Sequence, residues 1–186
     1  AEAFAQEGGT AHKTPAALAQ AADIIVSVVV NADQTEQVLF GANGAAAHMK
    51  AGSLFIMCST VDPNWSVALE KRLNDMGLLY LDAPISGGAA KAASGQMTMM
   101  TSGQAAAYTK AGNALESMAA NVYKLGDRAG YGSKVKIINQ LLAGVHIAAA
   151  AEAMALGLRE GVAADALYEV ITNSAGNSWM FENRMA

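Results

Sequence analysis

The stretch Asp-Ala-Pro-Ile-Ser-Gly-Gly at residues 82–88 follows the apolar run at residues 78–81, and it marks where a strand of the predicted fold ends. It places the hydroxyl of Ser86 and the backbone NH groups of Gly87 and Gly88 in a turn, where these donors can hold an anionic ligand. Glycine and serine are also the commonest residues of turns that bind nothing. Taken alone, the stretch leaves both a plain turn and a substrate site open.

Strand and helix patterns alternate on both sides of this stretch, as they do in a parallel sheet covered by helices on both faces. The run at residues 24–30 is rich in β-branched residues, as a strand buried on both faces requires. Further strands are expected at residues 53–58, 78–81, 97–101 and 122–125, and helices at residues 1–7, 16–21, 33–40, 64–76 and 104–119. We therefore predict an α/β fold with a partial Rossmann-type parallel sheet, and a partial dinucleotide-binding domain over residues 1–127.

The chain from Tyr131 to Glu160 has a helical pattern without proline, and this predicted helix is longer than most helices of globular proteins. Such a helix can leave one domain and begin the next. We therefore predict a partial all-α C-terminal domain over residues 128–186, which begins with this interdomain helix. Lys136 and Asn139 lie three residues apart within it and share one face.

The composition is that of an ordinary soluble globular protein, with 53% hydrophobic residues, 15% charged residues and a net charge of −4. No basic stripe indicates a nucleic-acid partner, and the three histidines lack the spacing of metal ligands. The single cysteine is compatible with a reducing cytoplasm. The apolar stretches at residues 24–30 and 141–158 are interpreted as buried elements and not as membrane spans, because the first has strand length and the second carries His146 and Glu152.

Two segments, in this order and with this spacing, resemble the signatures of the β-hydroxyacid dehydrogenase family, whose members are similar to 3-hydroxyisobutyrate dehydrogenase. They are the stretch at residues 82–88 followed by Gly95, and residues 132–139 with the motif Gly132-x-x-x-Lys136-x-x-Asn139. The run at residues 135–150 and the tail at residues 173–185 most resemble the branch of the family that acts on L-threonate.

Members of this family begin with a strand, a G-x-G-x-x-G fingerprint and a helix, because the glycines let the backbone approach a pyrophosphate at the helix N-terminus. No such fingerprint occurs in these 186 residues, and the sequence stops at Ala186, just after a helix of what the family continues as a larger helical domain. We therefore expect the chain to be an internal piece of a longer polypeptide, and we expect this piece alone to be inactive.

The resemblance implies an NAD- or NADP-dependent oxidoreductase that transfers a hydride between the nicotinamide and a small hydroxy acid. A four-carbon sugar acid such as L-threonate is the expected substrate, and reduction of tartronate semialdehyde or oxidation of 3-hydroxyisobutyrate are the alternatives. An alternative of another class is a non-catalytic scaffold with a dehydrogenase fold. The protein is expected to be a cytoplasmic homo-oligomer, a dimer or a tetramer, without a metal ion and without a nucleic-acid or membrane partner.

The same resemblance implies that Lys136 is the catalytic residue, an amine that takes the hydroxyl proton while the hydride leaves. It also implies two sets of binding residues, which are Ser86, Gly87, Gly88, Asn139 and Gln140 for the substrate and Asn31 and Thr60 for the dinucleotide. Plainer interpretations stay open, with Lys136 extending to solvent at a domain edge and Asn31 and Thr60 only capping strand ends.

Other chemically capable residues have expected structural roles. Asp82 is expected to accept hydrogen bonds from turn NH groups and not to act as a catalytic acid. Cys58 is expected to be a small buried residue and not a nucleophile, because it has no basic neighbour in the sequence. The aromatic cluster at residues 179–181 belongs either to the core or to a wall at the mouth of the site.

Overall fold

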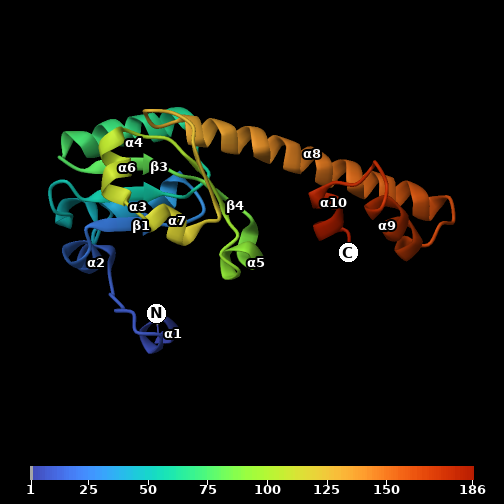
Figure 1. The fold of residues 1–186 in the computed structure, drawn as a ribbon, viewed down its shortest axis with the longest axis horizontal. Coiled ribbons are helices and arrows are strands. Elements are labelled where there is room, and N and C mark those ends of the chain that lie inside the picture. The colour runs from blue at the N-terminus through green and yellow to red at the C-terminus, as the bar shows by residue number, and fades with distance from the viewer. Residues whose placement is uncertain (1) are drawn as a thin grey trace. The chain divides into compact units, whose positions relative to one another are not determined.

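The computed structural model describes residues 2–186, which form two compact units, one ending at Lys136 and the other beginning at Ile137. Strands occur in the first unit, whereas the second unit is made of helices (Figure 1). The expected N-terminal helix is α1 (Glu2–Gln6), and Ala1 lies outside the described residues.

The first unit is built on two three-stranded sheets. In one sheet the strands are parallel in the order β1-β2-β3, and in the other β5 pairs with β4 antiparallel and with β6 parallel. A bridge between Asp82 and Ser102 connects the end of β3 to the segment after β5. The strands are β1 (Ile24–Ser27), β2 (Leu54–Met57), β3 (Leu79–Asp82), β4 (Ile85–Ser86), β5 (Thr98–Thr101) and β6 (Asn121–Lys124).

Short helices connect these strands, and side chains just before them fix where they begin. Thr14 accepts a hydrogen bond from the NH of Ala17 ahead of α2, and Asp62 caps α4 by accepting from the NH groups of Asn64 and Trp65. The helices are α2 (Pro15–Ala21), α3 (Ala32–Phe40), a 3₁₀ turn (Ala46–His48), α4 (Pro63–Asp75), α5 (Gly88–Ala93), α6 (Ala105–Ala111) and α7 (Ala114–Met118).

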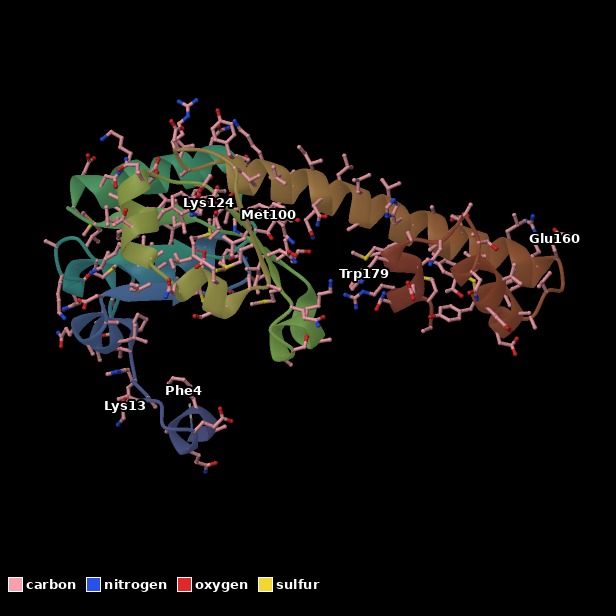
Figure 2. All side chains as sticks on the ribbon, in the orientation of Figure 1. Phe4, Lys13, Met100, Lys124, Glu160 and Trp179 are labelled. Atoms are coloured by element: carbon pink, nitrogen blue, oxygen red, sulfur yellow. The ribbon has the colours of Figure 1, made fainter. Side chains whose placement is uncertain are left out.

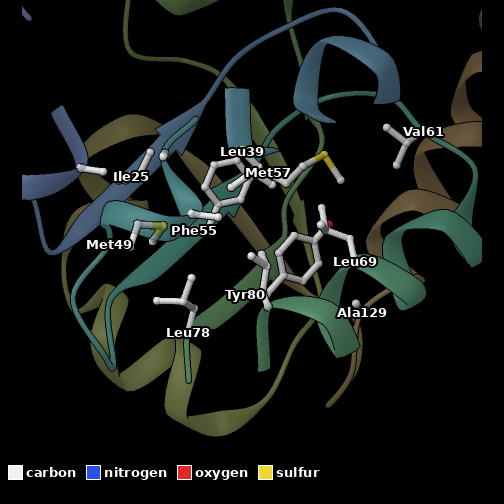
Figure 3. Packing of buried hydrophobic residues seen from close by; sticks show 14 residues of the cluster. Ile25, Leu39, Met49, Phe55, Met57, Val61, Leu69, Leu78, Tyr80 and Ala129 are labelled. Atoms are coloured by element: carbon white, nitrogen blue, oxygen red, sulfur yellow. The ribbon is translucent and has the colours of Figure 1, made fainter. Parts of the chain in front are cut away.

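Each face of the parallel sheet has its own hydrophobic cluster, because side chains along β2 point alternately to opposite faces. Phe55 and Met57 pack with residues of α3 and α4 on one face (Figure 3). Leu54 and Ile56 pack with residues of α6 and α7 on the other. Helices on both faces of a parallel sheet confirm the predicted α/β fold with a partial Rossmann-type sheet.

The first strand differs from the prediction. β1 is shorter than the predicted strand at residues 24–30, and it lies at the edge of the sheet because it pairs with β2 alone. Ile25 and Ser27 are buried, but Val26 is 37% exposed and Val28 is 65% exposed. The prediction of burial on both faces is wrong for these residues, because a β-branched composition does not reveal whether a neighbour covers the strand.

Two further segments are divided differently from the sequence patterns. The predicted helix at residues 104–119 is broken into α6 and α7 at Gly112, whose φ of +52° ends the first helix. The predicted turn after β3 contains regular structure, since Ser86 lies in β4 and Gly88 begins α5.

The second unit continues the long helix α8 (Tyr131–Arg159) and adds α9 (Ala164–Thr172) and α10 (Trp179–Arg184). Gly157 lets α9 approach α8 closely, because a Cβ at this position would collide with the Leu167 side chain. Tyr168 links α9 to α10, since its ring stacks on Phe181 at 5.9 Å between centroids and its hydroxyl donates to the carbonyl oxygen of Glu182 at 2.7 Å.

Apolar side chains cover much of α8 and remain exposed. Among residues 2–186, α8 is the one helix long and apolar enough to cross a membrane by length and composition, and 6% of that apolar window is buried. Leu141 and Leu142 are 65% and 53% exposed. The prediction of a buried element at residues 141–158 is therefore wrong for the described residues, because a helix that is apolar on all sides needs more neighbours than α9 and α10 provide.

Candidate active site

The two predicted dinucleotide-lining residues follow strands that end at the same edge of the parallel sheet. Asn31 comes after β1 and Thr60 after β2, and both are exposed. The carboxyl ends of parallel strands form the ligand crevice of open α/β sheets. Asn31 also has a structural task, because its Oδ1 accepts a hydrogen bond from the NH of Gln34 at 2.9 Å and caps α3. Its amide NH₂ group can still donate to a ligand.

Buried hydroxyl groups tie these two strand ends together. Ser59 donates through Oγ to the carbonyl oxygen of Val29 at 2.8 Å and lies 3.2 Å from Oγ1 of Thr35. Thr35 in turn donates to the carbonyl oxygen of Asn31 at 2.9 Å. Because Ser59 and Thr35 are buried, they hold the segments that carry Asn31 and Thr60 at a fixed spacing.

The predicted substrate segment combines a hydroxyl with an unusual backbone. Ser86 is half-buried and pairs with Thr98 across β4 and β5. Gly87 has a φ of +136° and Gly88 a φ of +67°, which side-chain-bearing residues rarely adopt. A Cβ at Gly87 would also lie 2.7 Å from Cβ of Lys91. The segment therefore presents one hydroxyl beside backbone NH groups at the start of α5, a donor set that suits a carboxylate.

Asp82, at the end of β3, has no exposed surface and its carboxylate accepts four hydrogen bonds. Its Oδ2 accepts from the backbone NH groups of Gly130 and Ser133, each at 2.9 Å. The hydroxyl of Ser102 donates to Oδ2 at 3.2 Å and the hydroxyl of Ser133 to Oδ1 at 2.7 Å. The predicted role as a structural acceptor is confirmed, but the NH groups belong to the start of α8 and not to the turn at residues 86–88.

The first turn of α8 also lies against the strands with very little space between them. The NH of Gly132 donates to Oγ of Ser102 at 2.9 Å. A Cβ at Gly132 would collide with the carbonyl oxygen of Met100 and would lie 3.0 Å from the carbonyl oxygen of Asp82. Met100 is labelled in Figure 2. Glycine is therefore required here for the backbone of α8 to approach β3 and β5.

Lys136 is buried while the residues on either side of it are exposed. It is 7% exposed, against 37% for Val135 and 41% for Ile137. Burial disfavours the charged ammonium and lowers the pKa of Lys136 below its ordinary value. None of the ion pairs among the described residues involves this side chain. The sequence predicted a lysine on a mostly buried helix, whereas the structure shows a buried lysine on a helix whose apolar neighbours are exposed.

The remaining predicted substrate residues belong to the second unit. Asn139 is half-buried and Gln140 is exposed, on the turn of α8 that follows Lys136. In the aromatic cluster, Phe181 is 2% exposed and belongs to the core of this unit. Trp179, which is labelled in Figure 2, is 46% exposed.

Cys58 follows β2 directly and is 6% exposed. Burial raises the pKa of its thiol to about 12, so the thiolate needed for nucleophilic attack does not form near neutral pH. The expectation of a small buried residue is confirmed.

A groove of ≈ 700 Å³ runs along the free edge of β1. Apolar side chains dominate its lining, among them Phe4, Leu18 and Val28. None of the predicted site residues lines this groove. Polar residues, among them Thr10, Lys13 and Thr14, also line it.

Two residues of this site, Ser102 and Ser133, have no assigned role in the sequence-based prediction. Ser133 stands 51 residues after Asp82 in the chain, and such a contact leaves no periodic signal. A usable signal exists in Gly130 and Gly132, because a helix that begins with glycines has no local side chain to cap it and needs an acceptor from elsewhere.

Comparison with known proteins gives two family matches that together cover nearly the whole chain. Residues 1–126 match the NAD-binding domain of 6-phosphogluconate dehydrogenase, and residues 130–186 match the family described as NAD-binding of NADP-dependent 3-hydroxyisobutyrate dehydrogenase. The chain belongs to the β-hydroxyacid dehydrogenase family. The resemblance predicted from the motifs is thereby confirmed.

Curated relatives in this family include L-threonate dehydrogenases. The chain is 65% identical to the enzyme of Cupriavidus necator over 98% of its own length, and 52% identical to that of Escherichia coli O6:H1 over 91%. It spans 61% and 56% of the lengths of these relatives. A crystal structure of 3-hydroxyisobutyrate dehydrogenase from Salmonella typhimurium superimposes with a TM-score of 0.89 at 52% identity, covering 92% of this chain and 60% of that one.

Proposed function

We propose that the protein is an NAD- or NADP-dependent dehydrogenase that oxidises a small hydroxy acid, with L-threonate as the substrate. The observation that carries this proposal is the side chain of Lys136, which is 7% exposed on a helix whose neighbouring side chains are apolar and exposed. Burying an ammonium is costly because it removes the charge from water. A lysine kept in such a position therefore points to a function that needs it there. Proton transfer at an active site is such a function.

The substrate is proposed from the relatives. The Cupriavidus necator and Escherichia coli proteins are named L-threonate dehydrogenases, whereas the Salmonella typhimurium structure is titled 3-hydroxyisobutyrate dehydrogenase at the same 52% identity as the Escherichia coli protein. The higher identity to the Cupriavidus necator enzyme favours L-threonate. Oxidation of 3-hydroxyisobutyrate or reduction of tartronate semialdehyde would use the same residues.

Lys136 acts as the general base in oxidation. The C–H bond of the carbinol breaks with its electron pair, the O–H proton passes to Nζ of Lys136, and a carbonyl forms. When bound, the nicotinamide supplies the hydride acceptor. Because burial lowers the pKa of Lys136, more of the amine is neutral and able to accept a proton at a given pH than for an exposed lysine. Oxidation should accelerate as the pH rises through this lowered pKa, and reduction should slow, because it uses the ammonium as the donor.

Ser86 and the NH groups of Gly87 and Gly88 bind the carboxylate of the substrate. Hydrogen bonds from a hydroxyl and from backbone NH groups to a charged acceptor are the strong kind. Asn139 and Gln140 bind the substrate hydroxyl groups, since an amide both donates and accepts hydrogen bonds.

The described residues fit the nicotinamide half of a dinucleotide better than its pyrophosphate. Asn31 and Thr60 stand exposed at adjacent strand ends, and buried Ser59 and Thr35 hold those ends together. We propose that Asn31 and Thr60 contact the cofactor, Thr60 near the nicotinamide ribose. The sequence contains no G-x-G-x-x-G turn that would hold a pyrophosphate at a helix N-terminus.

We further propose a dinucleotide-binding domain over residues 1–127, a helical domain from residue 128 onward, and a cytoplasmic homo-oligomer in which the apolar surface of α8 packs against other helices and not against a membrane. The lysine buried at its start and Glu152 within it support contact with protein. A non-catalytic scaffold is disfavoured because it would have no use for a lysine that is 7% exposed and has no ion pair among the described residues.

The test is a substrate profile of the whole protein with NAD and with NADP. L-Threonate, 3-hydroxyisobutyrate and L-serine are supplied for oxidation and tartronate semialdehyde for reduction, with nicotinamide absorbance as the readout. We expect the highest kcat/KM with L-threonate. A preference for another hydroxy acid would contradict the proposed substrate, and no turnover with any of them would favour the scaffold.

A further inference from the structure

The proposed reaction makes no direct use of Asp82, although this carboxylate is fully buried and accepts four hydrogen bonds. We infer that Asp82 is a positioning residue, which fixes the first turn of α8 and thereby the place of Lys136. This inference rests on the proposed role of Lys136 for its catalytic meaning.

The start of α8 has no cap of its own. The first NH groups of a helix have no partner within the helix and are normally satisfied by a local Ser, Thr, Asp or Asn side chain. The residue before α8 is Gly130, which has no side chain. Asp82 supplies the missing acceptor from 48 residues earlier in the chain, and its negative charge also suits the positive end of the helix.

Three contacts determine both the direction and the rotation of this first turn. Asp82 accepts from the NH and the hydroxyl of Ser133, which fixes the helix at the residue one turn before Lys136. Ser102 joins the two groups, because its hydroxyl donates to Asp82 and accepts from the NH of Gly132. Gly132 then brings the helix backbone against the carbonyl oxygens of Met100 and Asp82.

Burial of Lys136 depends on this placement. The residues on either side of it, Val135 and Ile137, are 37% and 41% exposed, so rotation of the helix about its axis would bring Lys136 toward water as well. Burial is the cause of its lowered pKa. Asp82 therefore acts on Lys136 through the geometry of the helix and not through its charge.

The experiment measures the titration of Lys136 directly, by competitive acylation of the whole protein over a range of pH with quantification of the labelled peptide by mass spectrometry. The variants are Asp82→Asn, which puts an amide donor among four donors, and Ser133→Ala. Ser133→Ala removes only one hydroxyl, so it keeps the test decisive if Asp82→Asn fails to fold. Ser133→Thr retains the hydroxyl and is the rescue variant. Tyr80→Phe is the matched control, because it removes a buried bond to Ser66 of 2.8 Å from the same strand without touching α8.

In Asp82→Asn we expect the pKa of Lys136 to rise toward its ordinary value, kcat to fall on the order of 10- to 100-fold, and the KM for the dinucleotide to stay within about twofold, as for a misplaced catalytic group. Ser133→Ala should show the same changes at smaller size, and Ser133→Thr should restore the parent values. Tyr80→Phe should lower the melting temperature without moving the titration of Lys136.

The inference is overturned if Asp82→Asn and Ser133→Ala lower the melting temperature but leave the titration of Lys136 where it is in the parent, as in Tyr80→Phe. It is equally overturned if Ser133→Thr behaves like Ser133→Ala. Failure of the proposed function has a different signature, which is retained turnover in Lys136→Met. The acylation result still decides whether Asp82 positions Lys136 in that case, because it does not depend on catalysis.

Discussion

The beginning of α8 buries polar groups, whereas the rest of that helix exposes apolar ones. In the first two turns, Gly132, Ser133 and Lys136 are buried, and the first two of these bond to Ser102 and Asp82. From Ile137 onward, large apolar side chains are exposed, Leu141 by 65%. Burial of polar groups is costly unless they are bonded or used, and exposure of a long apolar surface is unusual in a finished assembly. This difference fits the proposed proton transfer at Lys136 and the proposed packing of the remaining apolar surface against protein.

Replacing Lys136 by methionine should have the largest effect on turnover. We expect kcat to fall on the order of 100- to 10,000-fold, the usual contribution of a general acid–base group, with dinucleotide affinity nearly unchanged.

The same substitution should change the stability of the fold. The pKa of Lys136 is lower in the folded state than its ordinary value, so the unfolded chain binds more protons between these two pKa values and stability rises with pH there. The lysine therefore costs stability at pH values below its ordinary pKa, so the variant should melt at a higher temperature than the parent in that range. Steady-state kinetics, calorimetric titration and scanning calorimetry check the three parts, and near-normal turnover would remove Lys136 from the mechanism.

The remainder of α8 can be tested by the double substitution Ile138→Gln and Leu142→Gln. These positions are four residues apart on one face and are 60% and 53% exposed. If they pack against a second copy of the protein, loss of this apolar burial should weaken self-association by about 3 kcal/mol, roughly 100-fold in the dissociation constant. Sedimentation of the whole protein measures this. Ala148 is exposed on the same helix, so Ala148→Gln is a control that reports the effect of adding an amide alone. Equal sedimentation of the parent and the double variant would exclude this face as the interface.

Ser86→Ala tests whether the substrate binds in the first unit, which contains the buried polar start of α8. Loss of a hydrogen bond to a charged ligand group costs roughly 1.5–3 kcal/mol, so we expect the substrate KM to rise roughly 10- to 100-fold while cofactor affinity changes little. Ser94→Ala is the matched control, because Ser94 is exposed at the end of α5 and donates to the carbonyl oxygen of Lys91. Equal weakening of substrate and cofactor in calorimetric titrations would assign Ser86 to the cofactor site or to the fold.

Two glycine substitutions in α8 should change the stability of the fold in opposite directions. Gly132→Ala forces a methyl group against the carbonyl oxygen of Met100 and should destabilise the fold by about 1–3 kcal/mol. Gly144→Ala adds a methyl group with nothing within 4 Å and should stabilise the helix by about 0.5–1 kcal/mol, the difference in helix propensity. Denaturant titrations measure both. A destabilised Gly144→Ala would show that a neighbouring helix packs at that position in the assembled protein.

The sequence predicted those features that local patterns determine. The apolar runs at residues 53–58 and 78–81 identified β2 and β3, and the expected helix at residues 16–21 corresponds to α2. Exposure along β1 and α8 was not predictable, because a run of apolar residues has the same composition whether or not a neighbour covers it. The motifs singled out Lys136 and the resemblance supplied its role, but its burial comes from contacts that Asp82 makes with residues 48 and 51 positions away. Such contacts are properties of the fold and have no local signature.

The state of Cys58 has a practical consequence. The chain contains one cysteine, and burial keeps its thiol protonated and out of contact with solvent. Alkylating reagents and mild oxidants should leave it unmodified in the folded protein. A cysteine introduced on the surface would then be the only reactive thiol of this chain, so a fluorophore or spin label could be attached at one chosen site. Oxidative damage would fall first on exposed thioethers such as that of Met76, which is 43% exposed.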